Sequence, residues 1–161
     1  MTFRVTPRPK RRKLSAIFWD YENVQLNRTT CPIFLQALRN FMDLNPTQFA
    51  AVYYRTISCR PEILRQIQAI PGLQTKRVDN DAHNAVDSVL MQSCRDAINR
   101  HSTINHIVLI SGDADYRQLI SHLTNKRISV SIICRQGHYS RKLLRAGDLF
   151  RFHQADRKSV V

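Results

Sequence analysis

The sequence is organised around one stretch, Ile107-Val-Leu-Ile-Ser-Gly-Asp-Ala-Asp-Tyr116. Its first four residues are apolar and favour a β-strand, the strand breaks at Ser-Gly, and two carboxylates follow at the start of a predicted helix. A second segment, Leu14-Ser-Ala-Ile-Phe-Trp-Asp-Tyr-Glu-Asn23, is built in the same way. Carboxylates at the end of a buried strand are costly to desolvate, so we expect a functional site where these two strand ends meet.

The charge of the chain predicts a polyanionic partner. Its 161 residues include 25 Lys and Arg against 12 Asp and Glu, which leaves a formal net charge of +13. Such a surface is typical of proteins that bind RNA or DNA, and a basic surface that is merely solvated is the alternative. Because acids are scarce, their placement at predicted strand ends favours an acidic cavity in an otherwise basic protein. A metal-dependent nuclease requires this distribution of charge.

The chain has the length and composition of one globular domain. We divide it into a flexible basic arm over residues 1–13, a folded domain over residues 14–152 and a short tail over residues 153–161. We expect no signal peptide, because no apolar segment follows the basic N-terminus, and no apolar run is long enough to span a membrane. The four cysteines lack the spacing of a zinc site, so we expect reduced, buried thiols in a cytoplasmic protein.

Strand-like and helix-like segments alternate along the domain. We expect strands at 14–20, 48–54, 73–78, 106–111, 128–134 and 149–152, and helices at 32–42, 61–70, 85–100, 115–124 and 140–146. This alternation predicts a parallel sheet with helices on both faces. The expected class is α/β, a three-layer α/β/α sandwich around a mainly parallel sheet of Rossmann-like topology, with the strand at 73–78 at an edge.

The two acidic strand ends should meet in this fold. Ligands of open parallel sheets bind at the carboxyl ends of the strands, where the strand order reverses. If strands 14–20 and 106–111 are central neighbours, Asp20 and Asp113 lie side by side at that edge.

Two further acids are expected at the same edge. Asp87 lies in the first turn of the helix at 85–100, where the helix N-terminus favours a carboxylate. Asp115 follows Asp113, which we expect to be the nearer ligand of the two. Each acid alone has an ordinary explanation as a turn, N-cap or first-turn residue, but their joint placement favours a site.

A cluster of these carboxylates predicts a bound cation. Two carboxylates about 4 Å apart repel each other by about 4 kcal/mol at an effective dielectric constant near 20. A divalent cation removes this conflict, and oxygen ligands suit Mg²⁺ or Mn²⁺ rather than zinc. Such an ion orients a water molecule as the nucleophile and neutralises charge on a phosphate.

Three motifs, in this order, resemble those of NYN domains in the PIN-like nuclease superfamily: Phe18-Trp-Asp-Tyr-Glu-Asn23-Val, Val86-Asp87-Ser and Ser111-Gly-Asp-Ala-Asp-Tyr116. The resemblance covers residues 14–152. It implies a PIN-like α/β/α fold and an Mg²⁺- or Mn²⁺-dependent endoribonuclease that hydrolyses RNA phosphodiester bonds. The family also contains RNA-binding members with weak or undetected nuclease activity.

The resemblance assigns roles by position. The metal-binding and catalytic set is Asp20, Asp87, Asp113 and Asp115. Asn23 matches the Asn that follows the first Asp in the family, and it would bind a phosphate oxygen or steady that Asp. Tyr116 stands where many members have Phe, and we expect it to pack equally well.

Basic residues near the same edge are candidates for holding RNA. Cations and an aromatic residue interleave after the strand at 128–134, a pattern typical of single-strand binding surfaces. The candidates are Arg55, Arg117, Arg135, Arg141 and Lys142, and a solvated helix face is the alternative for each. Trp19 and Tyr21 flank Asp20 and are expected in the core.

Three classes of function stay open. The first is the metal-dependent ribonuclease acting on single-stranded RNA, and the second is an RNA-binding or scaffolding module with a vestigial site. The third is a phosphatase of the haloacid-dehalogenase type, which needs a second Asp two residues after the first, where this chain has Glu22. We expect RNA as the partner and no membrane, and a homodimer is left open.

Overall fold

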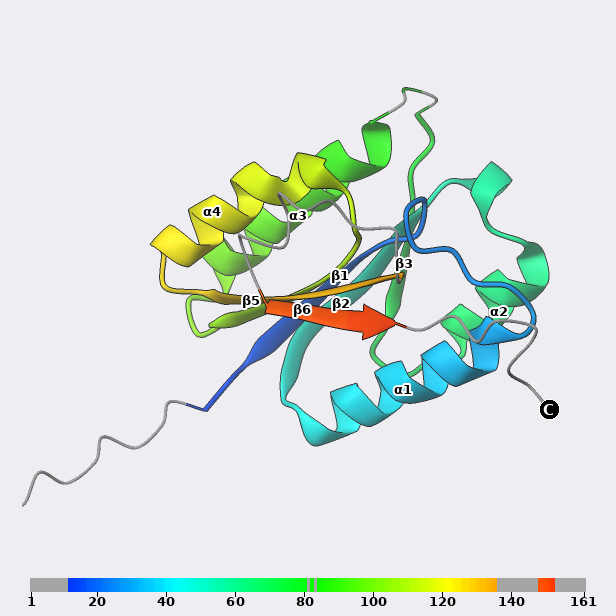
Figure 1. The fold of residues 1–161 in the computed structure, drawn as a ribbon, viewed down its shortest axis with the longest axis horizontal. Helices are drawn as coiled ribbons and strands as arrows, with labels where there is room; N and C mark the ends of the chain where they lie inside the picture. The colour runs from blue at the N-terminus through cyan, green and yellow to red at the C-terminus, as the bar shows by residue number, and fades with distance from the viewer. Residues whose placement is uncertain (1–11, 81, 83, 136–147, 153–161) are drawn as a thin grey trace, which may run out of the picture.

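The computed structural model describes residues 12–80, 82, 84–135 and 148–152, with one parallel sheet between two layers of helices (Figure 1). The six strands lie in the order β3-β2-β1-β4-β5-β6, and every neighbouring pair is parallel. The strands are β1 (Ser15–Asp20), β2 (Thr47–Tyr54), β3 (Gln74–Arg77), β4 (His106–Ile110), β5 (Ser129–Arg135) and β6 (Asp148–Phe152). The α/β class and the position of β3 at an edge are confirmed.

Four α-helices among the described residues cover the two faces of the sheet. They are α1 (Thr30–Leu44), α2 (Pro61–Gln68), α3 (Ala85–Arg100) and α4 (Arg117–Asn125), with two 3₁₀ turns, η1 (Thr56–Ser58) and η2 (Ala114–Tyr116). The helices α1 and α2 lie on one face, and α3 and α4 lie on the other (Figure 1). The predicted three-layer sandwich is therefore confirmed.

The strand order reverses between β1 and β4. The chain builds β1, β2 and β3 toward one edge, then crosses the sheet through α3 and builds β4, β5 and β6 toward the other. The two acidic segments of the sequence thus end on central neighbours, as predicted. Their carboxyl ends form the crevice in which open α/β sheets bind ligands.

The alternation of β1 determines which acid faces which layer. Ala16 and Phe18 belong to the core cluster under α3 and α4, whereas Ile17 and Trp19 belong to the cluster under α1 and α2. Because side chains alternate along a strand, Asp20 faces the α3 and α4 side. Trp19 and Tyr21 are buried in the opposite core, as expected.

Two helix starts differ from the sequence prediction. The first helix begins at Thr30 because the Asn27 side chain accepts hydrogen bonds from the N–H groups of Thr29 and Thr30, at 2.9 and 2.8 Å. The helix expected at 115–124 begins as the 3₁₀ turn η2, and its α-helical part starts at Arg117. This second difference changes the geometry of the acids at the site.

Other predictions have mixed outcomes. The four cysteines are buried thiols, as expected. None of the described helices combines the length and apolarity that crossing a membrane requires. The expected helix at 140–146, residues 1–11 of the basic arm and the tail at 153–161 lie outside the described residues.

Candidate metal centre

A tight turn after β1 connects the ends of the two central strands. The backbone N–H groups of Asn23 and Val24 donate to the carbonyl of Asp20, at 3.3 and 3.1 Å, and the Trp19 indole N–H donates to the carbonyl of Val24 at 2.9 Å. This turn directs the Asn23 amide oxygen to the backbone N–H of Gly112, at 2.6 Å. Asn23 therefore ties the end of β1 to the end of β4.

Asp20 is held in a buried set of hydrogen-bond donors. Its Oδ2 accepts from the Tyr116 hydroxyl at 3.0 Å and from the Ser111 hydroxyl at 3.4 Å, and its Oδ1 accepts from the Asn23 N–H at 3.3 Å. Only 2% of Asp20 is exposed. Burial raises the pKa of Asp20 to about 6, although the Tyr116 hydrogen bond acts in the opposite direction.

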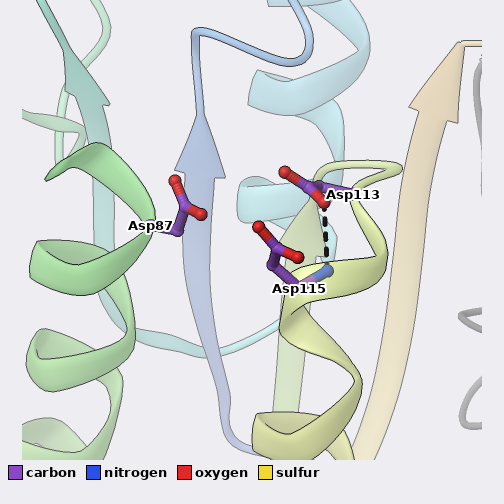
Figure 2. A group of neighbouring side chains, drawn as sticks. All are labelled: Asp87, Asp113 and Asp115. Atoms are coloured by element: carbon purple, nitrogen blue, oxygen red, sulfur yellow. Dashed lines mark hydrogen bonds between the residues drawn. The ribbon is translucent and has the colours of Figure 1, made fainter. Parts of the chain in front are cut away.

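Three other carboxylates gather beside Asp20. Each of Asp87, Asp113 and Asp115 offers one oxygen, and these oxygens all lie within 4.8 Å of one another. Figure 2 shows Asp87 on α3 facing Asp113 and Asp115, which come from the segment that leads into α4. We call these three residues the aspartate cluster.

The 3₁₀ turn brings two members of the cluster to the same side. The Oδ1 of Asp113 accepts a hydrogen bond from the Asp115 backbone N–H at 3.0 Å, so Asp113 caps η2. The Asp113 backbone N–H in turn donates to the Ser111 hydroxyl at 3.2 Å. Ser111 therefore links Asp20 to the start of η2.

Asp87 completes the cluster from the first turn of α3. It is 8% exposed, and burial raises its pKa, with the charges of Asp113 and Asp115 adding to the rise. Without a counter-charge, an ionised pair at 4.8 Å costs about 3.5 kcal/mol at an effective dielectric constant near 20, and solvent at the exposed Asp115 reduces this.

The cluster fits a hard divalent cation. All of its donor atoms are carboxylate oxygens, which Mg²⁺ and Mn²⁺ prefer. The three residues line a cavity of about 240 Å³ together with Asp20, Glu22, Asn23 and Arg55. The four predicted acids thus border one cavity, with Asp20 buried at its side.

The grouping differs from the expected ranking of ligands. All four acids were expected in the metal-binding set, with Asp113 as the nearer ligand and Asp115 as the less certain one. The cluster instead contains Asp115 and omits Asp20, which lies buried beside it. The reason is the 3₁₀ start at Ala114, which directs Asp115 toward Asp87 instead of along an α-helical first turn.

Glu22 and Arg55 satisfy each other at the rim of the cavity. The Glu22 carboxylate accepts from the Arg55 backbone N–H at 3.1 Å, from the Arg55 guanidinium at 3.0 Å and from the Ser58 hydroxyl at 2.7 Å. Burial alone would raise the pKa of Glu22, but these hydrogen bonds outweigh it and lower the pKa. The sequence left the role of Glu22 open and made Arg55 a candidate for holding RNA, so it did not predict this pair.

The remaining basic candidates lie in different places. Arg117 is exposed at the start of α4, beside the cluster. The Arg135 guanidinium donates to the backbone carbonyl of Gln25, in the loop between β1 and α1. Arg141 and Lys142 lie outside the described residues.

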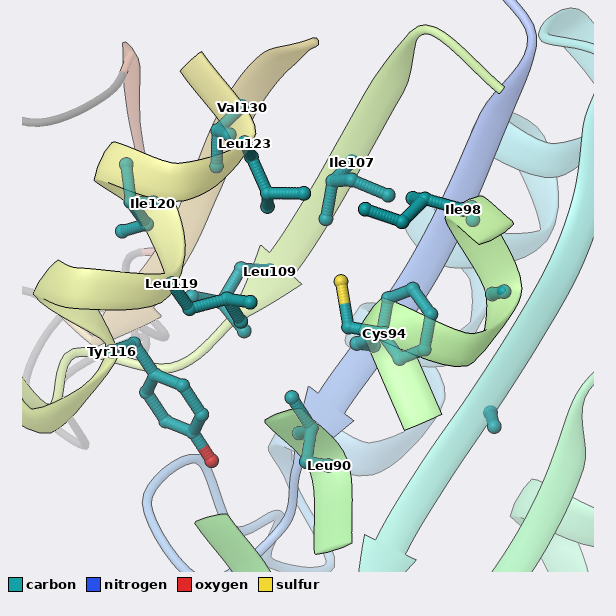
Figure 3. Packing of buried hydrophobic residues seen from close by; sticks show 14 of the residues in the cluster. Leu90, Cys94, Ile98, Ile107, Leu109, Tyr116, Leu119, Ile120, Leu123 and Val130 are labelled. Carbon is teal, nitrogen blue, oxygen red and sulfur yellow. The ribbon is translucent and has the colours of Figure 1, made fainter. Parts of the chain in front are cut away.

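Sequence reasoning missed the role of two hydroxyl groups. Tyr116 is fully buried, and its ring packs in the core cluster near Leu90 and Leu119 (Figure 3). It packs in the core as expected, and its hydroxyl also donates a hydrogen bond to Asp20, which the expected equivalence with Phe did not include. The sequence gives one signal of this role: the hydroxyl groups of Ser111 and Tyr116 belong to the same motif as Asp113 and Asp115.

Comparisons with known proteins agree with the fold and the motifs. A protein of unknown function from Vibrio parahaemolyticus has a similar structure, with a TM-score of 0.64, 18% identity, and coverage of 92% of this chain and 97% of that one. The nicotinamidase of Staphylococcus aureus is a more remote match, with a TM-score of 0.43, 10% identity, and coverage of 84% of this chain and 87% of that one. No curated protein sequence matches the chain.

The profile of the NYN domain matches residues 15–154. The chain therefore belongs to the NYN domain family, within the PIN-like nuclease superfamily.

Proposed function

We propose that this protein is an endoribonuclease that hydrolyses RNA phosphodiester bonds with Mg²⁺ or Mn²⁺. The observation that carries the proposal is the aspartate cluster, at the point where the strand order reverses in an NYN domain. The net charge of +13 supports a polyanionic substrate. Single-stranded RNA is the proposed substrate, because its unstacked bases can contact the protein beside the cavity, whereas the bases of an A-form duplex are stacked and its major groove is too narrow for side chains.

The cluster and Asp20 take different roles in this proposal. Asp87, Asp113 and Asp115 would hold the cation, which when bound would lower the pKa of a water molecule and neutralise charge on the phosphate. Asp20 accepts a proton or a hydrogen bond from the attacking water at Oδ1. That oxygen accepts only the Asn23 N–H among the described residues, so it retains acceptor capacity. A carboxyl group with a pKa of about 6 is mostly ionised at neutral pH and is still basic enough to accept a proton from water.

Asn23 and the basic side chains position the substrate and the strand ends. Asn23 uses its amide oxygen on Gly112, which leaves its amide N–H groups for a phosphate oxygen. Arg117 is the proposed phosphate contact beside the cluster, with Arg141 and Lys142 as further contacts. Arg55 and Arg135 have protein partners, Glu22 and the backbone carbonyl of Gln25, so we propose them only as secondary contacts to RNA.

Two other functions receive less support. An RNA-binding module needs the basic surface but not three carboxylates whose mutual repulsion destabilises the chain without a cation. A dehalogenase-type phosphatase would need an acid at position 22 that is available to the substrate, and Glu22 is engaged by Arg55 and Ser58.

Cleavage of a labelled single-stranded RNA by the purified full chain tests the proposal. We expect cleavage with Mn²⁺ or Mg²⁺ and none with EDTA. Asp87→Asn should lower the rate at least about tenfold, because even residues that only support metal ligands cost this much. The matched control is Asp96→Asn, the same chemical change at an exposed position of the same helix, which should retain the rate.

Two results would refute the ribonuclease. One is RNA that stays intact with every divalent cation while it still binds the protein, which selects the RNA-binding module. The other is equal rates for the Asp87→Asn and Asp96→Asn proteins, which assigns the cleavage to a contaminant or to another site.

A further inference from the structure

A second hollow opens directly from the acidic cavity. It has a volume of about 500 Å³ and shares Asn84, Asp87 and Asp115 with that cavity. Its lining residues come from the start of α3 and from the segment formed by η2 and α4. The helices α3 and α4 lie on the same face of the sheet (Figure 1). We call it the α3–α4 groove, and its own lining residues are Ser88, Met91, Ala114, Arg117 and Gln118.

A polymer centred on the aspartate cluster has to extend beyond the acidic cavity. On the β2 side the cavity ends at Glu22 and Arg55, whose charges neutralise each other through an ion pair at 3.0 Å. That wall is also braced by the Ser58 hydroxyl, which donates to Glu22 at 2.7 Å. Within the part of the chain that the structure describes, the hollow continues into the α3–α4 groove through Asn84, Asp87 and Asp115.

The groove has the chemistry that a nucleotide needs. Arg117 is exposed, and its guanidinium forms no ion pair with any acid in the described part of the chain, so its charge is available to a phosphate. Met91 is half-buried and gives the groove an apolar, deformable surface against which a base can pack. Gln118 is exposed beside Arg117 and adds an amide donor and acceptor.

We propose that the α3–α4 groove binds the stretch of single-stranded RNA next to the scissile phosphate, with Arg117 on the neighbouring phosphate and Met91 under a base. This rests on the proposed function, because the aspartate cluster defines where the scissile phosphate lies. The contacts are to backbone and base face, so the groove accepts RNA of any sequence.

Binding can be measured without cleavage, by fluorescence anisotropy of a labelled oligouridine of about ten nucleotides, within the size range of single-strand sites. Ca²⁺ replaces the catalytic ion, because it also binds carboxylate oxygens, and a gel verifies that the RNA stays intact. Arg117→Glu should weaken binding about three- to tenfold and lower the slope of log K against log salt by about one. The matched control, Arg65→Glu on α2 at the opposite face, changes the net charge equally and should leave the slope unchanged.

A second pair of variants tests the groove by its shape. Ser88→Tyr places a bulky side chain in the groove without a change of charge, and should weaken binding by a similar factor. Ser121→Tyr makes the same change at an exposed position of α4 outside the groove, and should bind as the parent does. Thermal unfolding verifies that all four variants remain folded.

The inference is overturned if Arg117→Glu and Arg65→Glu weaken binding equally, or if Ser88→Tyr binds as well as Ser121→Tyr. RNA that binds in the groove and is never cut by Mn²⁺-loaded protein would refute the ribonuclease and leave the groove standing. If the protein cleaves RNA and neither Ser88→Tyr nor Arg117→Glu changes its affinity for RNA, RNA binding in the groove is refuted and the ribonuclease activity is not.

Discussion

Removal of the Tyr116 hydroxyl should destabilise the protein in a pH-dependent way. The Tyr116→Phe variant loses the hydrogen bond from the phenol to Oδ2 of Asp20, at 3.0 Å between two buried residues. A hydrogen bond to a charged group contributes about 1.5–3 kcal/mol, and one between neutral groups about 0.5–1.5 kcal/mol. The loss should therefore depend on whether Asp20 is ionised.

The protonation of Asp20 sets the direction of the pH effect. Its pKa in the folded protein is about 6, and the Tyr116 hydroxyl favours the ionised form. At about pH 8 the variant should lose about 1.5–3 kcal/mol of unfolding free energy, or roughly 3–12 °C in Tm for a chain of this size. At about pH 5, where Asp20 is protonated, the loss should fall to about 0.5–1.5 kcal/mol.

Urea unfolding at the two pH values, without divalent cations, measures both losses. The matched control is Tyr53→Phe, because Tyr53 is equally buried in the same core cluster but its hydroxyl forms no hydrogen bond with a residue of the site. A loss for Tyr116→Phe that equals the Tyr53→Phe loss at about pH 8, or that is the same at both pH values, would contradict the assignment.

Three further predictions concern the acids. Folding raises the pKa of Asp20 from 3.8 to about 6, so the stabilisation that Asp20 provides is complete below about pH 4 and is lost by about pH 6. In urea titrations of the metal-free protein, the unfolding free energy relative to the Asp20→Asn variant should fall by about 3 kcal/mol over this pH range. A difference that does not change with pH would contradict this prediction. The Asp115→Asn variant removes a negative charge that repels Asp87, so calorimetry should show a metal-free Tm at least equal to that of the parent. The increase in Tm on addition of Mn²⁺ should be smaller than in the parent. An equal increase in Tm would exclude Asp115 as a ligand. The Glu22→Gln variant should lose about 1 kcal/mol of unfolding free energy, because it removes the partly buried ion pair with Arg55. Its affinity for Mn²⁺, measured by titration calorimetry, should equal that of the parent. A large loss of affinity would make Glu22 a ligand.

Local patterns were sufficient to predict the sheet. The buried, apolar β1 and β4 segments predicted two central strands, and the polar Lys76 and Arg77 predicted an edge strand, because only central parallel strands are buried on both faces. The rule that ligands bind where the strand order reverses then brought Asp20 and Asp113 to one edge.

The internal order of the site could not be predicted in the same way. Asp115 joins the cluster because the chain enters α4 through one tight 3₁₀ turn, and a change of helix type rotates a side chain without leaving a signal in hydrophobic periodicity. The bonds from Tyr116 to Asp20 and from Arg55 to Glu22 join residues far apart in the chain. Their partners depend on tertiary packing, which propensities do not encode.

The most direct test of the central claim is an anomalous difference map from a crystal of this protein soaked in Mn²⁺ at neutral pH. We predict a peak among Asp87, Asp113 and Asp115, at about 2.1 Å from carboxylate oxygens of at least two of them, with Asp20 outside direct contact. A map with no peak at the aspartate cluster would contradict the claim that these residues form a metal centre.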